Sequence, residues 1–305
     1  MKSIEASPAF EIQSRDITYI GHDLSRPECV LAQPDGALWI SDNRGGVTRR
    51  TPDGAQTILG AIQGTPNGLA MEASGALLVA EIEHGGVHRL FADGRHEPIL
   101  TSLSGERLGA VNFIHIDMKG AVWVTVSTRT LPRIEAINRP IADGYILKLE
   151  SSGPRVVASG LCFPNELRID ELHQYAYLAE SARGRIVRMR LLPDGGLGPP
   201  EAFGPAPLFE GAIVDGVAFD AAGGLWVTEV KRNGLYRITP DGRCQRLFED
   251  PTGTILLFPA SVAFGGPDLR TVFIGSILAK RLATFRSPIP GAPLSHWRRD
   301  QPPAA

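Results

Sequence analysis

Six copies of one pattern run through the 305-residue chain, and this repetition limits the fold more than any other feature. Each copy has an apolar strand, a turn that often contains Gly, and a second strand centred on a large apolar residue. The six central residues, spaced 39, 45, 54, 49 and 47 positions apart, are Trp39, Leu78, Trp123, Tyr177, Trp226 and Phe273. In five copies a third strand with a basic residue follows, and a weaker fourth run closes the unit.

Four short antiparallel strands that recur every 40 to 50 residues are typical of a β-propeller, because one such sheet cannot bury both faces without neighbours. We therefore predict an all-β, six-bladed β-propeller with four antiparallel strands per blade around a central channel. It would form a single domain over 1–305, with many tight turns made from 34 Gly and 24 Pro. The predicted repeats are 28–66, 67–111, 112–164, 165–214, 215–260 and 261–297, followed by a tail at 298–305.

The ends of the chain offer two segments that could complete the ring of blades. The Pro-rich end predicts a last outer strand around Leu294 to Trp297, and a strand within Phe10 to Ile20 is the N-terminal candidate. The repeated tryptophans are predicted to be core between blades. The basic residues of the third strands recur with the repeat and are assigned to the scaffold: Arg49, Arg89, Lys148, Arg188 and Arg237.

One position before each first strand carries a side-chain oxygen in all six copies. The six residues are Glu28, Asn67, Asn112, Asn165, Asp215 and Ser261. Because first strands line the axis of a propeller, these side chains are expected to form a ring around the channel. Oxygen donors without thiolate or histidine suit a hard divalent cation. The alternative is that Asn and Asp only start strands by bonding their own backbone.

A second set of positions, three residues past each central residue, forms a predominantly acidic rim at the same end of the blades. Its members are Asp42, Glu81, Val126, Glu180, Glu229 and Ser276. These groups would either hold the metal ligands in place or bind the backbone of nearby loops.

Four motifs stand before first strands: Arg26-Pro27-Glu28, Val111-Asn112-Phe113, Phe163-Pro164-Asn165 and Val214-Asp215-Gly216. In this order, and over nearly the whole chain, they resemble the gluconolactonase and regucalcin family, also called senescence marker protein-like. The resemblance implies that Glu28, Asn165 and Asp215 bind a catalytic divalent ion, with Ca²⁺ the first choice and Mg²⁺, Mn²⁺ or Zn²⁺ as alternatives. It also implies that Asn112 contacts substrate or helps bind metal, and that Asp215 is the general base.

The chain departs from the family pattern at two places. Many members have an Asn-Asp pair with an Arg upstream where this chain has Ala110-Val111-Asn112-Phe113, and the apolar residues there favour a substrate with hydrocarbon bulk. Glu166 replaces the usual Gly after the metal-binding Asn. It is interpreted either as an extra acid or base at the substrate site or as a solvated strand start.

The resulting functional prediction is a metal-dependent hydrolase that opens a lactone or related ester. A bound cation would polarise the carbonyl, and Asp215, with Glu166 in reserve, would deprotonate water. No Gly-x-Ser-x-Gly motif is present for a serine hydrolase. The alternatives are a metal-dependent lyase with a histidine base, for which His115 is the weak candidate, and a non-catalytic binding platform.

A long insertion in the third repeat, Ser127 to Gly144, is predicted to act as a lid or specificity element at the metal end. Within it, Arg129 and Arg133 could steer an anionic substrate or product. The predicted substrate-binding set is therefore Asn112, Phe113, Glu166 and Arg129.

Composition excludes several other partners. A formal charge of −2 with interspersed signs offers no basic face for nucleic acid, and no segment is apolar and long enough to suggest a membrane span. The N-terminus lacks a secretory signal, and three widely spaced cysteines suggest no disulfide framework. A cytoplasmic enzyme acting on a small molecule is expected, of unpredicted oligomeric state.

Overall fold

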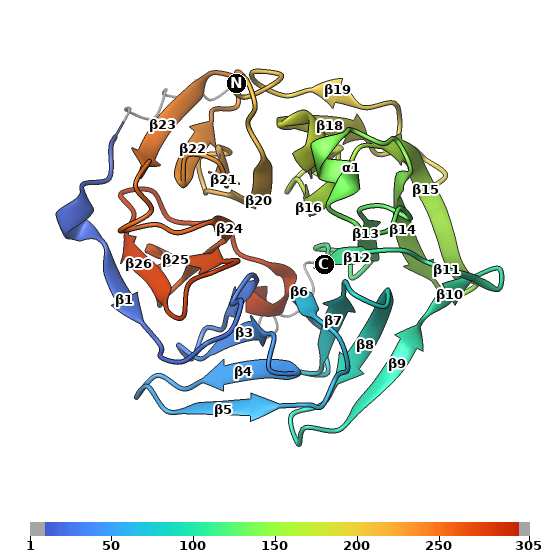
Figure 1. The fold of residues 1–305 in the computed structure, drawn as a ribbon, viewed down its shortest axis with the longest axis horizontal. Coiled ribbons are helices and arrows are strands. Elements are labelled where there is room, and N and C mark those ends of the chain that lie inside the picture. Colours follow the sequence, from blue (N-terminus) through green and yellow to red (C-terminus); the bar gives the residue numbers. More distant parts are fainter. Residues whose placement is uncertain (1–9, 299–305) are drawn as a thin grey trace, which may run out of the picture.

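The predicted six-bladed propeller is confirmed. A computed structural model describes residues 10–298, which form six four-stranded antiparallel sheets arranged in a ring (Figure 1). The first three blades are β2 (Val30–Ala32), β3 (Leu38–Asp42), β4 (Gly46–Arg50) and β5 (Gln56–Leu59); β6 (Pro66–Met71), β7 (Leu77–Glu81), β8 (Gly86–Leu90) and β9 (His96–Leu100); and β12 (Val111–Ile116), β13 (Val122–Val126), β14 (Gly144–Glu150) and β15 (Gly153–Leu161). The others are β16 (Pro164–Ile169), β17 (Tyr175–Glu180), β18 (Arg185–Arg190) and β19 (Glu201–Ala202); β20 (Val214–Phe219), β21 (Leu225–Glu229), β22 (Gly234–Ile238) and β23 (Cys244–Glu249); and β24 (Pro259–Gly265), β25 (Thr271–Ser276), β26 (Leu282–Arg286) and β1 (Thr18–Ile20).

Burial explains why the inner strands were clearer in the sequence than the fourth strands. Strands such as β3, β7 and β21 are buried along their whole length, because they lie between neighbouring blades and need apolar residues on both faces. The outer strands β5 and β9 contain no fully buried residue, so their sequences need little apolar character.

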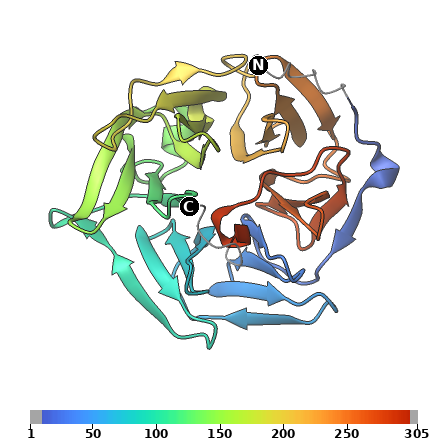
Figure 2. The ribbon, with the colours of Figure 1, turned by 180° about the vertical axis from the view of Figure 1, so that it is seen from behind.

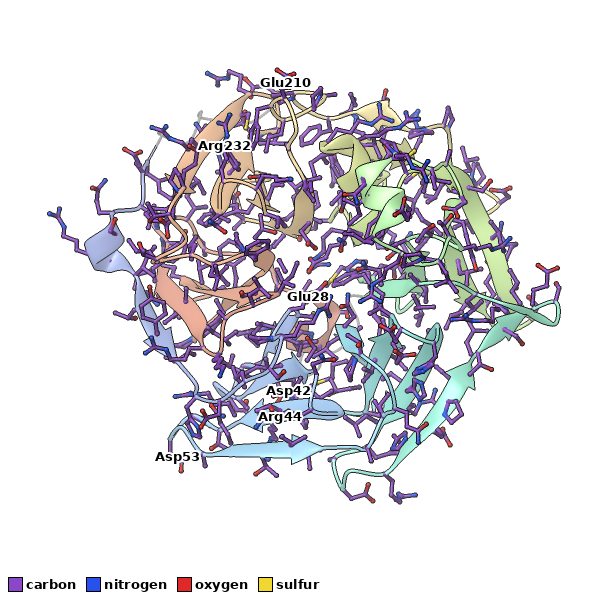
Figure 3. The ribbon with its side chains drawn as sticks, viewed as in Figure 1. Glu28, Asp42, Arg44, Asp53, Glu210 and Arg232 are labelled. Atoms are coloured by element: carbon purple, nitrogen blue, oxygen red, sulfur yellow. The ribbon has the colours of Figure 1, made fainter. Side chains whose placement is uncertain are left out.

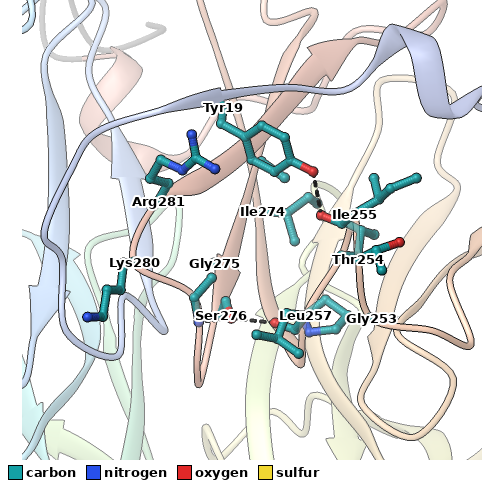
Figure 4. Close-up of a pocket in the computed structure, with 14 residues that line it drawn as sticks. Tyr19, Gly253, Thr254, Ile255, Leu257, Ile274, Gly275, Ser276, Lys280 and Arg281 are labelled. Carbon is teal, nitrogen blue, oxygen red and sulfur yellow. Dashed lines mark hydrogen bonds between the residues drawn. The ribbon is translucent and has the colours of Figure 1, made fainter.

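The last blade is closed by the N-terminus, as one of the two candidates predicted. β1 pairs with β26, with Thr18 opposite Thr284, and the Tyr19 hydroxyl donates to the carbonyl of Ile255 at 2.9 Å (Figure 4). The prediction of an outer strand at Leu294 to Trp297 is wrong. Prolines at positions 288, 290 and 293 precede this segment, and proline has no N–H to donate to a strand ladder.

The C-terminal segment instead turns inward to the channel axis, where it ends in the short 3₁₀ helix η3 (Ser295–Arg298). Figure 2 shows this segment in red near the axis on the face opposite that of Figure 1. Ala292 N donates to the carbonyl of Phe219, and Trp297 Nε1 donates to that of Ala32. The predicted tail beyond residue 298 lies outside the described residues.

The aromatic and basic residues of the repeat are scaffold, as predicted. Trp226 is fully buried and packs edge-on against Phe264 of the next blade, with ring centroids 5.1 Å apart. On the neighbouring strand Arg237 lies opposite Trp226, and it forms a buried ion pair with Asp220. In the third blade Lys148 lies 5.1 Å from the centroid of the Trp123 ring.

A few further elements lie outside the blades. A hairpin, β10 (Ser102–Leu103) and β11 (Glu106–Arg107), connects the second and third blades, and the 3₁₀ helix η1 (Ser14–Asp16) precedes β1. The long insertion between β13 and β14 contains the one-turn helix α1 (Glu135–Asn138), which packs on the 3₁₀ helix η2 (Ser181–Arg183) of the fourth blade and lies in front of the strands in Figure 1.

Candidate functional site

The structure brings the six oxygen-bearing residues together around the axis, and each is buried to 5 % exposure or less. A local irregularity explains their orientation. In five of the first strands the ladder shifts register at this position, for example between Pro164 and Leu167 and between Val214 and Val217. Such a bulge leaves residues without a partner in the ladder and re-aims their side chains. Figure 3 places Glu28 beside the axis, whereas Asp42 lies farther out in the same blade.

One side of the ring is a closed polar network centred on Glu28. The Arg26 guanidinium forms an ion pair with Glu28 Oε2, and its Nη1 donates to Asn67 Oδ1 at 2.6 Å. Asn67 Nδ2 in turn donates to Glu28 Oε1 at 2.9 Å and lies 3.3 Å from Asn112 Oδ1. Arg26 belongs to one of the four sequence motifs, but no role was predicted for it. Its place two residues before a ring carboxylate was the available signal.

The other side of the ring has unsatisfied acceptors. Asn165 Oδ1 and Asp215 Oδ1 are buried and have no hydrogen-bond partner among the described residues, while Asn165 Nδ2 donates to Ser181 Oγ at 3.2 Å. Burial raises the pKa of Asp215 well above its usual range, and the nearby carboxylates of Glu28 and Glu166 raise it further. Buried acceptors without donors beside a cluster of negative charge are what a cation site requires.

Glu166, the residue after Asn165 of the ring, is buried, so its interpretation as a solvated strand start is wrong. The equivalent bulge position is Gly68 in the second blade, where an added Cβ would come within 2.6 Å of the Phe113 Cα in the next blade. In the fourth blade the Glu166 carboxylate crosses to the next blade and accepts from Val217 N at 3.1 Å. It also accepts from Arg168 Nη2 at 3.1 Å. Burial raises the pKa of Glu166 to about 7 although Arg168 opposes the shift.

The acidic rim binds loop backbone, which was the simpler of its two interpretations. Glu81 accepts from Thr65 N, Glu180 from Cys162 N and Glu229 from Ile213 N, at 2.8, 2.8 and 2.9 Å. Each of these amides lies two or three residues before a ring residue. The rim therefore fixes the segments that deliver Asn67, Asn165 and Asp215 to the axis. The remaining rim positions are Asp42, which binds Arg44 and Thr48, the apolar Val126, and Ser276, which accepts from Leu278 N and Ala279 N.

A cavity of about 890 Å³ opens above the ring. Its lining includes Glu28, Asn112, Asn165 and Asp215, together with Arg26. Most of the wall is apolar and comes from the loops that surround the channel mouth. These residues are Ile82, Leu131, Pro132, Ile134, Ile137, Phe163, Ile213, Val230, Phe258 and Ile277.

The structure does not bring all predicted substrate-binding residues to this cavity. Of the four, only Asn112 is in its lining. Arg129 lies outside, with its guanidinium carbon 4.8 Å from the Tyr145 ring, and Phe113 is buried in the core between the first two blades. Arg133 does reach the cavity, where Nη1 forms an ion pair with Glu83 at 2.7 Å.

The donor set fits a hard cation. Within residues 10–298 no group of three or more His, Cys, Asp or Glu side chains is arranged to hold a metal ion. The set of Glu28, Asn165 and Asp215 is not a group of that kind, because the donor from Asn165 is an amide oxygen. All of its donors are oxygen, and two of the three residues carry an acceptor that has no hydrogen-bond partner within residues 10–298.

Other features of the described structure do not compete for this assignment. A cavity of about 450 Å³ between the fifth and sixth blades, beside Tyr19 and Arg281, has no carboxylate in its lining (Figure 4). No histidine lines the 890 Å³ cavity, and His115 faces the other end of the channel. The three cysteines form no disulfide. None of the helices in residues 10–298 has the length and apolar character needed to span a membrane.

Comparison with known proteins gives consistent results. The pattern described as the SMP-30/Gluconolactonase/LRE-like region matches residues 26–278. A 6-deoxy-6-sulfogluconolactonase of Pseudomonas putida is 28 % identical over 200 residues, which cover 65 % of each chain. Pentonolactonase XacC of Haloferax volcanii is 26 % identical over 209 residues, covering 68 % of this chain and 65 % of the relative. The match therefore spans slightly under two thirds of the length of both relatives.

Solved structures share the fold at lower identity. A gluconolactonase from Xanthomonas campestris is 20 % identical with a TM-score of 0.72, over 94 % of this chain and 96 % of the other. A calcium-binding protein, regucalcin, from Agrobacterium tumefaciens is 16 % identical with a TM-score of 0.69, over 92 % and 98 %. Since the family pattern covers most of the chain and includes every ring residue, this protein belongs to the SMP-30/gluconolactonase/LRE-like family.

Proposed function

We propose that this protein is a lactone hydrolase and that Glu28, Asn165 and Asp215 would hold a divalent cation at its site. The observation that carries the proposal is the pair of unpaired buried oxygens, Asn165 Oδ1 and Asp215 Oδ1, at the floor of a cavity large enough for a small molecule. The lactonases of Pseudomonas putida and Haloferax volcanii support the reaction class.

The electrostatics of the ring support a resident cation. Glu28, Asp215 and Glu166 are buried near one another, and Arg26 and Arg168 supply the opposing charge within the same network. Burying like charges together costs free energy unless a cation compensates them. When bound, a divalent cation supplies positive charge that polarises the lactone carbonyl and stabilises the developing oxyanion.

The residues of the chain would then divide the remaining tasks. Asp215 takes a proton from the attacking water and returns it to the ring oxygen that leaves. Its burial and its acidic neighbours raise the pKa of Asp215, which offsets the lowering that a bound cation causes. Asn112 lines the cavity and would hydrogen-bond the substrate. Arg26 and Asn67 hold the Glu28 carboxylate in place.

Of the two candidate bases, Asp215 is favoured because it lines the cavity. Glu166 does not, and its Oε2 already accepts hydrogen bonds from Val217 N and Arg168 Nη2.

The apolar wall favours a lactone with hydrocarbon bulk. The sequence prediction assigned this preference to Val111 and Phe113, which are buried in the core and do not line the cavity. Side chains of the channel loops, such as Leu131 and Ile134, form the apolar wall instead.

The test is the substitution Asp215→Asn, with Asn67→Ala as the matched control from the same ring. Loss of a general base typically lowers the rate by about 10² to 10⁴, and weaker cation binding adds to the loss. Asn67→Ala removes one hydrogen bond to Glu28, but the Arg26 ion pair still holds that carboxylate, so this variant should retain measurable activity and its metal. Turnover of lactones and metal content are measured on the same samples. Near-wild-type turnover by Asp215→Asn at full metal occupancy would exclude Asp215 as the base, and unchanged metal retention would exclude it as an important ligand.

A further inference from the structure

The far end of the channel contains a second cavity, of about 510 Å³. It is formed where the first strands end, by residues 169–172, 218–221 and 262–264, and by the C-terminal segment at 292–297. The ring of six oxygen-bearing residues, which includes Glu28 and Asp215, lies at the end of the channel where the first strands begin. The two cavities therefore lie at opposite ends of the channel.

Arg168 projects a buried guanidinium into the wall of this second cavity. The residue is 8 % exposed, and its guanidinium carbon lies 4.6 Å from the centroid of the Phe113 ring. A guanidinium carries five N–H donors. Nη1 donates to the carbonyl of Leu167 at 2.9 Å and Nη2 to Glu166 Oε2 at 3.1 Å, whereas the buried Nε has no partner among the described residues. The Nε atom is enclosed, whereas Nη1 and Nη2 each use only one of their two N–H groups in these bonds, so the guanidinium has donors left for an acceptor in the cavity.

The acidic groups near the cavity are mostly engaged elsewhere. Asp220 accepts from Arg237 Nε at 2.6 Å and from Trp226 Nε1 at 3.0 Å. Asp170 Oδ1 accepts from the backbone amides of residues 174 and 175, and Glu171 is on the exposed rim. Among the described residues that line the cavity, Arg168 is therefore the cation, and its guanidinium has N–H donors that the protein does not use.

His115 stands beside Arg168 in the same wall. Burial lowers the pKa of His115 to about 3, and the Arg168 charge contributes. The imidazole is neutral at physiological pH, so it adds no charge but can exchange a hydrogen bond with a ligand head group.

The rest of the cavity is apolar. Its surface comes from Ile169, Tyr177, Phe219, Val262, Phe264 and Trp297. We propose that this cavity binds an amphipathic monocarboxylate, such as a medium-chain fatty acid, with its carboxylate on the Arg168 guanidinium and its hydrocarbon chain against these side chains. The cavity volume is in the usual range for a small-molecule site. The site is separate from the lactone site and does not depend on the proposed hydrolysis.

The experiment measures binding of octanoate to the full chain by calorimetry and by the change in tryptophan fluorescence, to which Trp297 in the cavity wall contributes. Octan-1-ol, which has the same chain without the charge, is the matched ligand. We expect one octanoate per chain, and binding weaker by about 10- to 100-fold for octan-1-ol and for Arg168→Met, the size of a lost charge-assisted hydrogen bond. Asp215→Asn, at the other end of the channel, should bind octanoate like the wild type.

Four results would overturn the proposal: no octanoate binding by the wild type, equal binding of octanoate and octan-1-ol, wild-type affinity in a folded Arg168→Met variant, or loss of binding in Asp215→Asn. If Arg168→Met does not fold, Ala292→Trp replaces it. Ala292 lines the cavity without contributing to the ring, so the larger side chain should occlude the site. Unchanged octanoate binding by Ala292→Trp would equally refute the site. Absence of lactone hydrolysis would leave each of these outcomes unaffected.

Discussion

Substitution of Glu166 by Gln should stabilise the protein at alkaline pH when the metal has been removed. Burial raises the pKa of Glu166 from 4.5 to about 7. In the unfolded chain the carboxyl loses its proton near its ordinary pKa, whereas the folded protein holds the proton until about pH 7. The folded state therefore binds more protons in this window, and the free energy of unfolding falls as pH rises through it.

The size of the effect follows from the two pKa values. A difference of one pKa unit between the folded and unfolded states corresponds to about 1.4 kcal/mol. Ionising Glu166 in the folded state therefore lowers the free energy of unfolding by about 3 kcal/mol, and this loss is complete well above pH 7. A Gln at this position stays neutral and avoids the cost. We expect Glu166→Gln to exceed the wild type in free energy of unfolding by about 3 kcal/mol at pH 8.5, with little difference at pH 4.5.

The assay is denaturant unfolding of chelator-treated protein at both pH values. Glu210→Gln is the control, because Glu210 is exposed at the edge of the molecule (Figure 3) and should leave the pH dependence unchanged. A difference between Glu166→Gln and wild type that does not grow with pH would refute the reasoning. So would a variant that is less stable than wild type at pH 8.5.

The remaining predictions concern the cavity wall and the scaffold. Trimming the insertion within 129–142 should change substrate preference more than thermal stability, since Leu131 is 67 % exposed and the loop packs over the cavity mouth; an unchanged profile over a lactone panel would contradict this. Alkyl-substituted lactones should have a higher kcat/KM than gluconolactone because the wall is apolar, and steady-state kinetics showing the reverse would exclude that role for the wall. Arg237→Met should lower the free energy of unfolding by about 3 to 5 kcal/mol, because it leaves the Asp220 carboxylate buried and unpaired; a loss below 1 kcal/mol in urea unfolding would count against it.

The sequence determined the number of blades and the positions of the ring. Both follow from the repeat, because equivalent positions in equivalent blades must have equivalent environments. Trp39, Trp123 and Trp226 recur since each blade must fill the space between its neighbours. The ring residues were found in the same way, one per copy at the start of the strand that lines the axis.

Only the tertiary structure decided what lies outside the repeat. Two segments could close the sixth blade, and β1 fills that place while the Pro-rich C-terminal segment crosses to the far end of the channel. Similarly, Asn165 and Glu166 are neighbours in a bulge, yet of the two only Asn165 lines the 890 Å³ cavity. The physical reason is the same in both cases. These choices depend on contacts between distant segments, such as Glu166 with Val217, 51 residues apart, and Tyr19 with Ile255, 236 residues apart. A local pattern contains no information about which distant partner will satisfy a given group.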